Sequence, residues 1–238
     1  MEQRFRHSVV DTMAITPTGP TPRPMRYSDL PTTVDTTMAA SNSDPLHQYV
    51  TETSDRNYAR FLRLNDIMWR YIEWSVRTYT QSIWTIDGGK GFVTIDGGDR
   101  TFSKSQKLVR KIGDILTRGL HSFRSRELRN RLAEFKDKTN DIIMSNLGQE
   151  RAKEMIGLSG IAVHPDLQGI GYGTQLGQVD VFDGRESFVI SSNEAANTAF
   201  YKYLGYETVA TYTVGESNPA WKKPPVHLAL LVRKSMKQ

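Results

Sequence analysis

The feature that most constrains the fold is an apolar run followed closely by glycines on alternate positions. The run covers residues 155–163, and the glycines are Gly169, Gly171 and Gly173. Such glycines leave the backbone without side-chain cover, so several N–H groups can face one anion. A helix start near residue 174 would add the positive end of its dipole there. The pattern predicts a strand, a tight turn and a helix that together bind a pyrophosphate.

Two common phosphate-binding loops do not fit this turn. A dinucleotide-binding fingerprint would need a third glycine where Thr174 stands. A Walker A loop would need a lysine directly after its last glycine, and the chain has none near Gly173. The pattern that fits is Gln-x-x-Gly-x-Gly, formed by Gln168, Gly171 and Gly173 after a Val-His-Pro segment.

A second motif follows about twenty residues later. Residues 187–192 are typical of a short strand, and a helix is predicted from about residue 194, capped by Ser192 or Asn193 and ended by Gly205. Asn197 and Tyr201 are four residues apart, so they share one face of that helix.

Together the two motifs resemble the GCN5-related N-acetyltransferase (GNAT) superfamily. The first is similar to its acyl-CoA loop, and the string Asn-x-x-x-Tyr-Lys-x-Leu-Gly-Tyr at 197–206 is similar to its second signature. Their order and spacing also agree. The segments 44–46 and 221–225 look like those of a fungal-type subgroup.

The resemblance implies an α/β (α+β) fold in three layers, in which helices flank a mixed, strongly twisted sheet of about six to seven strands. It covers residues 25–235 as a single acyltransferase domain. A helical insertion is expected at about 102–150 and the acyl-CoA-binding core at about 155–206.

The implied activity is transfer of an acetyl group from acetyl-CoA, as co-substrate, to a primary amine, by direct attack in a ternary complex without a metal. The cofactor-binding residues would be Ile161, Ala162, Val163, Gln168, Gly169, Ile170, Gly171, Tyr172, Gly173, Thr174, Asn197 and Tyr201. Backbone amides of the loop would hold the pyrophosphate, and the strand would pair with the pantetheine arm. Tyr201 would protonate the leaving thiolate.

The base that deprotonates the amine is not assigned. Many family members carry a carboxylate on the strand before the loop, but residues 157–162 contain none. Glu194, seven residues before Tyr201, is the candidate catalytic base, and Glu154 is another. Taken without the resemblance, Tyr201 would be a half-buried packing residue. Tyr172 would either pack against the helix or cover the cofactor.

Three functions remain open at this point. The first is acetylation of a small amine, the second is acetylation of a protein or peptide, and the third is acyl-CoA binding without catalysis. Monomer and homodimer are both compatible with the sequence. The chain has no cysteine, which excludes disulfides and thiolate metal sites and suits a reducing compartment, so we expect a cytoplasmic location with the nucleus as the alternative. It has no apolar run long enough for a transmembrane helix.

Prolines at positions 17, 20, 22 and 24 disfavour helix and central strand, so residues 1–24 are predicted to be a leader without regular structure. A short strand at 25–27, a helix from Ser28 or Asp29 to about Ala40, and a second helix start at Asp44-Pro45 should follow. Apolar residues at 61, 64, 68, 71, 72 and 76 have helical spacing. Residues 82–86 and 91–95 predict a hairpin.

The predicted insertion is basic. Between residues 104 and 138 it has eleven Lys or Arg and four Asp or Glu, which gives 11 − 4 = +7, against +5 for the whole chain. Such a run is most often a solvated helix face. The sharper alternatives are a surface for the 3′-phospho-ADP end of coenzyme A, for an acidic partner or for nucleic acid. Nucleic acid is the least favoured, since few aromatic residues interrupt the basic ones.

Overall fold

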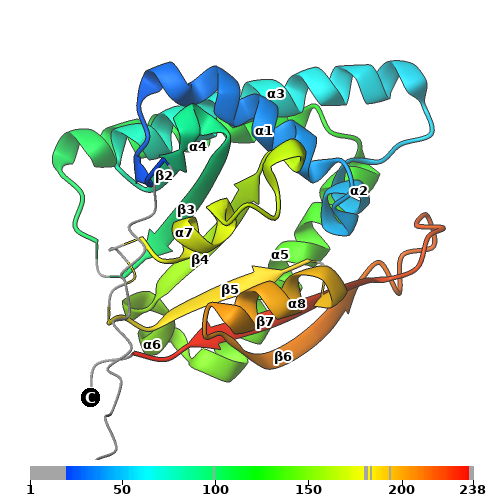
Figure 1. Cartoon of the computed structure of the whole chain (residues 1–238). Coiled ribbons are helices and arrows are strands. Elements are labelled where there is room, and N and C mark those ends of the chain that lie inside the picture. Colours follow the sequence, from blue (N-terminus) through cyan, green and yellow to red (C-terminus); the bar gives the residue numbers. More distant parts are fainter. Residues whose placement is uncertain (1–19, 99, 180–181, 183, 193, 236–238) are drawn as a thin grey trace, which may run out of the picture.

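A seven-stranded mixed sheet forms the centre of the computed structural model, which describes residues 20–98, 100–179, 182, 184–192 and 194–235, the backbone alone for 194–196. The strands are β1 (Arg23–Pro24), β2 (Ile83–Ile86), β3 (Gly91–Gly97), β4 (Ile156–Val163), β5 (Ser187–Ser191), β6 (Glu207–Val214) and β7 (Val226–Arg233). Their order is β1-β2-β3-β4-β5-β7-β6 (Figure 1). β4 and β5 are parallel, and the other neighbours are antiparallel. The predicted mixed sheet is confirmed.

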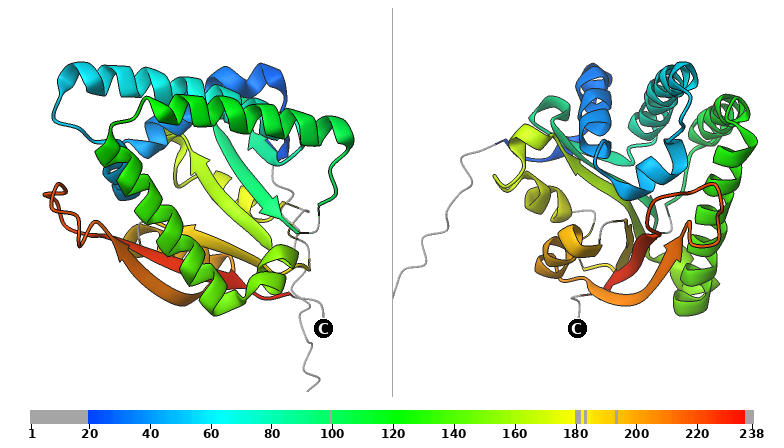
Figure 2. Two further views of the ribbon diagram at one scale, coloured as in Figure 1. Left: turned by 180° about the vertical axis from the view of Figure 1, so that it is seen from behind. Right: turned by 90° about the vertical axis from the view of Figure 1, so that its right-hand side faces the viewer.

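Helices cover both faces of this sheet, as the three-layer prediction requires. They are α1 (Leu30–Ser41), α2 (Pro45–Thr51), α3 (Arg56–Tyr79), α4 (Lys104–Ser122), α5 (Arg126–Leu147), α6 (Gln149–Glu154), α7 (Tyr172–Gly177) and α8 (Glu194–Tyr203). On one face, Leu176 of α7 and Tyr201 of α8 pack with Leu231 of β7. On the other face lie α1, α3 and α5 (Figures 1 and 2), where Leu30 and Trp74 pack with Phe92 of β3.

Local capping explains where several helices begin and end. The Asp44 carboxylate accepts a hydrogen bond from the His47 backbone N–H at 2.7 Å, so α2 begins where the Asp-Pro pair predicts. Ser125 caps α5 through the Leu128 N–H at 3.2 Å. Gly205 follows α8 with φ of 84°, the left-handed conformation expected of a C-terminal glycine.

The N-terminal elements differ from the prediction. The first strand is β1, two residues before the expected 25–27, and Tyr27–Asp29 forms a 3-10 helix instead. Asp29 explains the difference, because its carboxylate accepts two hydrogen bonds from the Arg23 guanidinium (2.8 and 2.9 Å) and one from the Arg26 N–H (2.9 Å). These bonds turn the chain before it can extend. The predicted leader falls mostly on residues 1–19, outside the described part.

The predicted helical insertion between β3 and β4 is present as α4, α5 and α6. α3 and α4 run antiparallel and in close contact: a Cβ on Gly113 of α4 would lie 2.6 Å from Val76 Cγ2 on α3. A glycine is therefore required at this crossing. α4 and α5 meet at residues 123–125, behind the sheet in the view of Figure 1 and in front of it in the left view of Figure 2.

The apolar stripes of α3 and α4 face the solvent. Their exposed members are Phe61, Leu64, Met68 and Tyr71 on α3 and Leu108, Ile112, Ile115 and Leu116 on α4, with exposed fractions between 39% and 62%. The inward face of α3 carries Asn65 and Asp66 beside Leu62 and Trp74. The spacing therefore predicted the helices but not their orientation, since polar residues of α3 line a cavity described below. No helix of the described residues is long and apolar enough to cross a membrane.

Candidate active site

The central feature of the site is a fork between β4 and β5. The two strands pair in parallel only through residues 156–158 and 187–189, and then they diverge (Figure 1). Beyond that point β4 still pairs with β3, while no strand of the described residues pairs with its other edge. The register of β3 and β4 shifts between Thr94 and Ile95, which leaves Ser159 as the extra residue of a β-bulge. The fork thus exposes a free strand edge at residues 159–163.

A cavity of about 610 Å³ opens at the fork. It is lined by six of the residues predicted to bind the cofactor: Ile161, Ala162, Val163, Gln168, Asn197 and Tyr201. Its other walls come from α1, α2, α3, β3, α4, α5 and the end of β5. The structure therefore brings the two sequence motifs together around one space.

The predicted pyrophosphate loop follows β4 directly. Gln168 holds the start of the loop, since its side-chain amide donates to the Val163 carbonyl at 3.2 Å. Gly169 and Gly171 have φ of 81° and 94°, and a Cβ on either would meet open space. Both therefore leave their amides uncovered, as the glycine pattern predicted.

The remaining loop residues, Gly169, Ile170, Gly171, Tyr172, Gly173 and Thr174, do not line the cavity itself. The Tyr172 side chain belongs to the core and donates to an Asp87 carboxylate oxygen at 3.3 Å. Its ring packs in the core, so only the backbone of Tyr172 is available to contribute to the predicted pyrophosphate loop. At Gly173 a Cβ would lie 3.2 Å from the Phe200 ring, which explains a glycine there by packing.

Tyr201 is buried, with 6% of its surface exposed, and its ring packs edge-on against Phe200 and Tyr206. Its hydroxyl has no hydrogen-bond partner among the described residues, although the residue lines the cavity. Burial, reinforced by Tyr206 and by the charge of Asp44, raises the pKa of the phenol well above its ordinary value. At neutral pH Tyr201 is a protonated donor.

The two glutamates considered as bases are placed differently. Glu194 is the first residue of α8, and its side chain lies outside the described part. Glu154 is the last residue of α6 and lines a separate cavity with Arg151 and Arg185. Glu154 is therefore not in the space that holds Tyr201.

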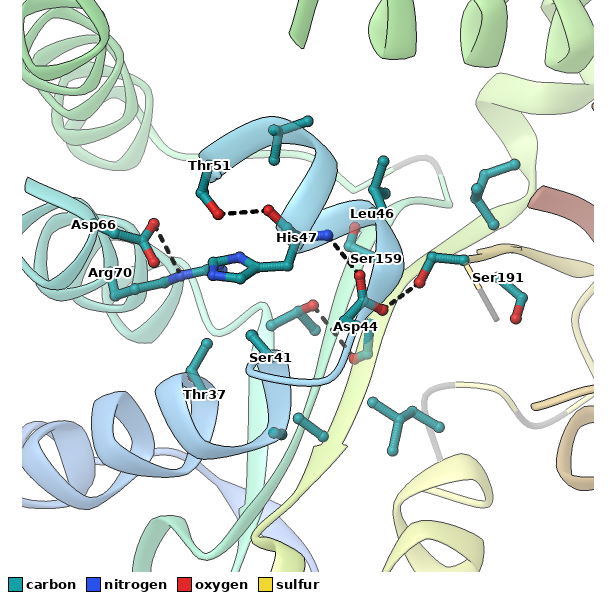
Figure 3. Close-up of a pocket in the computed structure, with 18 of the residues that line it drawn as sticks. Thr37, Ser41, Asp44, Leu46, His47, Thr51, Asp66, Arg70, Ser159 and Ser191 are labelled. Atoms are coloured by element: carbon teal, nitrogen blue, oxygen red, sulfur yellow. Dashed lines mark hydrogen bonds and ion pairs between the residues drawn. The ribbon is translucent and has the colours of Figure 1, made fainter. Parts of the chain in front are cut away.

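Asp44 and His47, which sequence reasoning did not assign to the site, line the cavity from α2 (Figure 3). The Asp44 carboxylate accepts hydrogen bonds from the His47 backbone and from the Ser192 hydroxyl. Burial lowers the pKa of the His47 imidazole; the charge of Asp66 opposes this effect, and that of Arg70 adds to it. The only sequence signal was the Asp-Pro pair, which was interpreted as a helix start and as part of a segment that looks like a fungal-type subgroup, but not as part of the site.

Four further charged residues line the cavity: Asp66 and Arg70 of α3, Arg124 in the α4–α5 turn, and Lys136 of α5. Arg70 lies 3.7 Å from an Asp66 oxygen and stacks on Trp69 with its guanidinium 4.2 Å from the ring centre. Arg124 is only 7% exposed. The prediction of a solvated basic face is therefore wrong for this arginine. Within the described residues, no cluster of histidine and carboxylate side chains could hold a metal ion.

No protein-family model matches the chain, and no curated protein sequence matches it. A solved structure from Corynebacterium glutamicum, described as "histone acetyltransferase HPA2 and related acetyltransferase", aligns with a TM-score of 0.50 and 13% identity over 92% of this chain and 98% of that one. A mosquito arylalkylamine N-acetyltransferase-like protein aligns at 0.45 and 13%, over 90% and 99%. A Staphylococcus aureus N-acetyltransferase aligns at 0.47 and 11%, over 89% and 99%. The chain has the fold of the GCN5-related N-acetyltransferases.

Proposed function

We propose that the protein belongs to the GNAT superfamily and transfers an acetyl group from acetyl-CoA to the primary amine of a small molecule. The observation that carries this proposal is the fork, where a free strand edge at residues 159–163 borders the cavity that Tyr201 lines. An extended pantetheine arm carries amide groups and can add to such an edge as a further strand does. The C. glutamicum fold neighbour, itself described as an acetyltransferase, adds support.

The cofactor would lie along the fork with its pyrophosphate on the amides of residues 168–174. The open space around Gly169 and Gly171 leaves room for such a group. Asn197 would fix the arm, and a backbone N–H of Ile161, Ala162 or Val163 would donate to the thioester oxygen as its charge develops.

The chemistry needs one proton acceptor and one donor. The neutral amine attacks the thioester carbon, the carbon–sulfur bond breaks, and the thiolate takes the Tyr201 hydroxyl proton. The proton lost by the amine nitrogen passes to a base, for which His47, Asp44 and Glu194 are the candidates, and the base then returns one proton through water to the Tyr201 phenolate. The lowered pKa of His47 keeps its imidazole neutral, as a base must be at neutral pH.

The size and walls of the cavity favour a small acceptor over a protein. A volume of about 610 Å³ is within the range of small-molecule sites, which is about 300–1,000 Å³. α1, α2 and α3 all contribute to its walls. Acetyl-CoA offered with small amines or with lysine peptides, with thiol release as the readout, tests this choice. Binding of acetyl-CoA without thiol release from any acceptor would instead favour a non-catalytic binding protein.

A pair of loop variants tests where the cofactor binds. Gly171→Asp and Gly171→Asn impose the same strain at φ of 94°, but only the first places a negative charge against the amides. We expect Gly171→Asp to bind acetyl-CoA at least about tenfold more weakly than Gly171→Asn, by calorimetry at low salt. Equal affinity of the two variants would exclude the loop as the pyrophosphate site.

A further inference from the structure

Arg124 is a buried cation without a partner. It is 7% exposed, lines the cavity, and its Nε has no hydrogen-bond partner. None of the described residues forms a hydrogen bond or an ion pair with its guanidinium. Burial lowers the pKa of Arg124, and the charges of Asp66 and Tyr58 oppose this effect. A buried charge is costly unless it is paired, so a guanidinium held in this way favours an anionic ligand.

The turn that carries Arg124 is fixed by neighbouring groups. Tyr58 donates its hydroxyl to the Phe123 carbonyl at 3.3 Å and accepts from the Ser125 N–H. Arg129 donates to the carbonyl of Arg124 itself at 2.7 Å. Because the backbone on both sides is held, the fold fixes the direction in which the Arg124 side chain leaves the turn.

A second cation stands at the same end of the cavity. Arg70 also has a buried Nε without a hydrogen-bond partner, and its contact with Asp66 at 3.7 Å is longer than a hydrogen bond. His121, beside these groups, has its pKa lowered to about 4 by burial and by Arg124, so it adds no charge at neutral pH. Lys136 of α5 also lines the cavity and, with Arg124, acts on His121, so three cations and the Asp66 carboxylate give a local balance of 3 − 1 = +2.

The opposite end of this part of the cavity is acidic. Figure 3 shows His47 between the Asp66–Arg70 pair on one side and Asp44 on the other. Asp44 is close enough to Tyr201 to raise the pKa of its phenol. A ligand that places an anionic group at the arginines can therefore extend past His47 with a cationic group toward Asp44 and Tyr201.

We propose that the acceptor is an amine that also carries a carboxylate, and that Arg124 and Arg70 bind this carboxylate at the end of the cavity formed by α3 and the α4–α5 turn. This inference rests on the proposed acetyl transfer. The planar guanidinium matches a carboxylate in a two-point contact, which a lysine could not provide. The acceptor class is then that of amino acids and related amino-carboxylates.

The layers of the fold separate this anion site from the predicted cofactor phosphates. The pyrophosphate loop leads into α7, which packs on one face of the sheet. Arg70 is on α3, which packs on the other face. The two anionic groups thus enter the cavity from opposite sides, so Arg124 is assigned to the acceptor and not to coenzyme A.

The first experiment compares acceptors that differ only in the carboxylate. Glycine, β-alanine, 4-aminobutyrate and 6-aminohexanoate, together with the other nineteen standard amino acids, are each paired with their carboxamides, and thiol release from acetyl-CoA is measured. O-phosphoethanolamine paired with ethanolamine adds a phosphate arm. We expect kcat/KM to favour the best carboxylate over its amide by about 30- to 10³-fold, the range for a desolvated charge left unpaired. Preference for amides, neutral amines or the phosphate would overturn the inference.

The second experiment removes the cation. Arg124→Met keeps an unbranched chain, and Arg126→Met, two residues away at an exposed position, is the matched control. We expect Arg124→Met to lower kcat/KM for the preferred carboxylate by about 30- to 10³-fold, to change that for its amide little, and to leave acetyl-CoA affinity intact. Equal losses for acid and amide would overturn the role. If Arg124→Met does not fold, Arg124→Lys replaces it in this comparison, because lysine keeps the charge but not the two-point contact.

A binding measurement separates this inference from the proposed activity. Sodium 6-acetamidohexanoate should raise the Tm of the wild-type protein more than 6-acetamidohexanamide does, and this difference should disappear in Arg124→Met. Acetyl-CoA binding with no difference between the two compounds would overturn the anion site while the transferase proposal stands. Failure of acetyl-CoA to bind would overturn the transferase proposal itself.

Discussion

At the scale of single residues, burial decides the protonation state of Tyr201. The residue is enclosed by two aromatic rings, and its hydroxyl is left free of protein partners among the described residues. The raised pKa of the phenol holds the proton on the oxygen throughout the neutral range. A protonated phenol can donate a hydrogen bond to a thiolate that forms beside it, and the raised pKa makes it a weaker acid than an ordinary tyrosine.

Tyr201→Phe removes the hydroxyl and keeps the packing of the ring. If Tyr201 is the general acid, kcat at saturating acetyl-CoA should fall by about 10²-fold, the low end for lost acid–base catalysis, because a thiolate is a fair leaving group. The affinity for acetyl-CoA should stay near wild type, since the proton transfer matters only in the transition state. Rapid-quench measurement of the chemical step provides the test.

Tyr203→Phe is the matched control, because Tyr203 lies two residues away on α8 with 72% of its surface exposed. Unchanged kcat in both variants would exclude a catalytic role for Tyr201. Asn197→Ala should show the opposite pattern to Tyr201→Phe, with the cofactor affinity reduced more than the turnover.

His121 gives a prediction about pH and stability. Burial, together with Arg124 and Lys136, lowers the pKa of its imidazole from 6.5 to about 4. Between these two values the His121 imidazole is protonated in the unfolded chain but neutral in the folded protein. The free energy of unfolding therefore decreases as the pH falls through this window. Above pH 6.5 both states are neutral and the effect vanishes.

Replacing His121 with glutamine removes this proton and should flatten the dependence. We expect the Tm of the wild-type protein to fall more than that of His121→Gln as the pH is lowered from 6.5 to 4. Differential scanning calorimetry across this window measures both slopes. Parallel slopes would show that the imidazole is protonated in the folded protein.

At the scale of elements, the sequence could predict what depends on near neighbours in the chain. Asp44-Pro45 and Gly205 mark helix ends through contacts within one turn, and α2 and α8 begin or end accordingly. The β2–β3 hairpin and the α4 and α5 insertion were predicted for the same reason. The 25–27 strand was wrong, because the bonds of Asp29 to Arg23 and Arg26 compete with an extended chain.

The orientation of α3 could not be predicted in this way. An apolar stripe normally faces the core, but here it faces solvent, and Asn65 and Asp66 are turned inward. What decides between the two faces is the polar cavity under the helix, whose other walls come from distant parts of the chain.

The exposed stripe leads to a stability prediction. Ile112 on α4 is 48% exposed, whereas Leu128 on α5 is 2% exposed. Ile112→Lys should change the free energy of unfolding by no more than about 0.5 kcal/mol, as is usual for surface positions. Leu128→Ala should lower it by about 2–5 kcal/mol, because it leaves a cavity in the core. Denaturant unfolding measures both, and a large loss in Ile112→Lys would mean that this face is covered in solution.

At the scale of the whole molecule, one half of the candidate site consists of short sequence motifs, and the other half is brought together only by tertiary packing. The loop at 168–173 and the helix with Asn197 and Tyr201 each have a motif that can be recognised from residue spacing. The acidic and basic groups of the cavity come from α2, α3 and the α4–α5 turn, and no spacing in the chain connects them. Their meeting depends on how the layers pack.

If acetyl-CoA binds along the fork as proposed, it should stabilise the folded protein as a whole. With acetyl-CoA at about 100 times its Kd, mass action stabilises the folded state by about 2.7 kcal/mol. For a chain of this size we expect Tm to rise by about 5–11 °C, taking about 2–4 °C per kcal/mol. Amide hydrogen exchange should slow in residues 159–163, which gain partners on their free edge. Exchange that slows elsewhere but not in this segment would place the ligand outside the fork.

The insertion of α4, α5 and α6 leaves the sheet at the end of β3 and returns at the start of β4, which are paired neighbours. An excursion whose two ends already lie side by side can change in length or sequence at little entropic cost and without altering the strand register. The chain therefore carries Arg124 on an excursion whose length does not set the strand register of the fork. If the proposed acceptor site is right, descendants of such a protein could exchange one acceptor for another by changing the turn between two helices, while the strands of the fork keep their places.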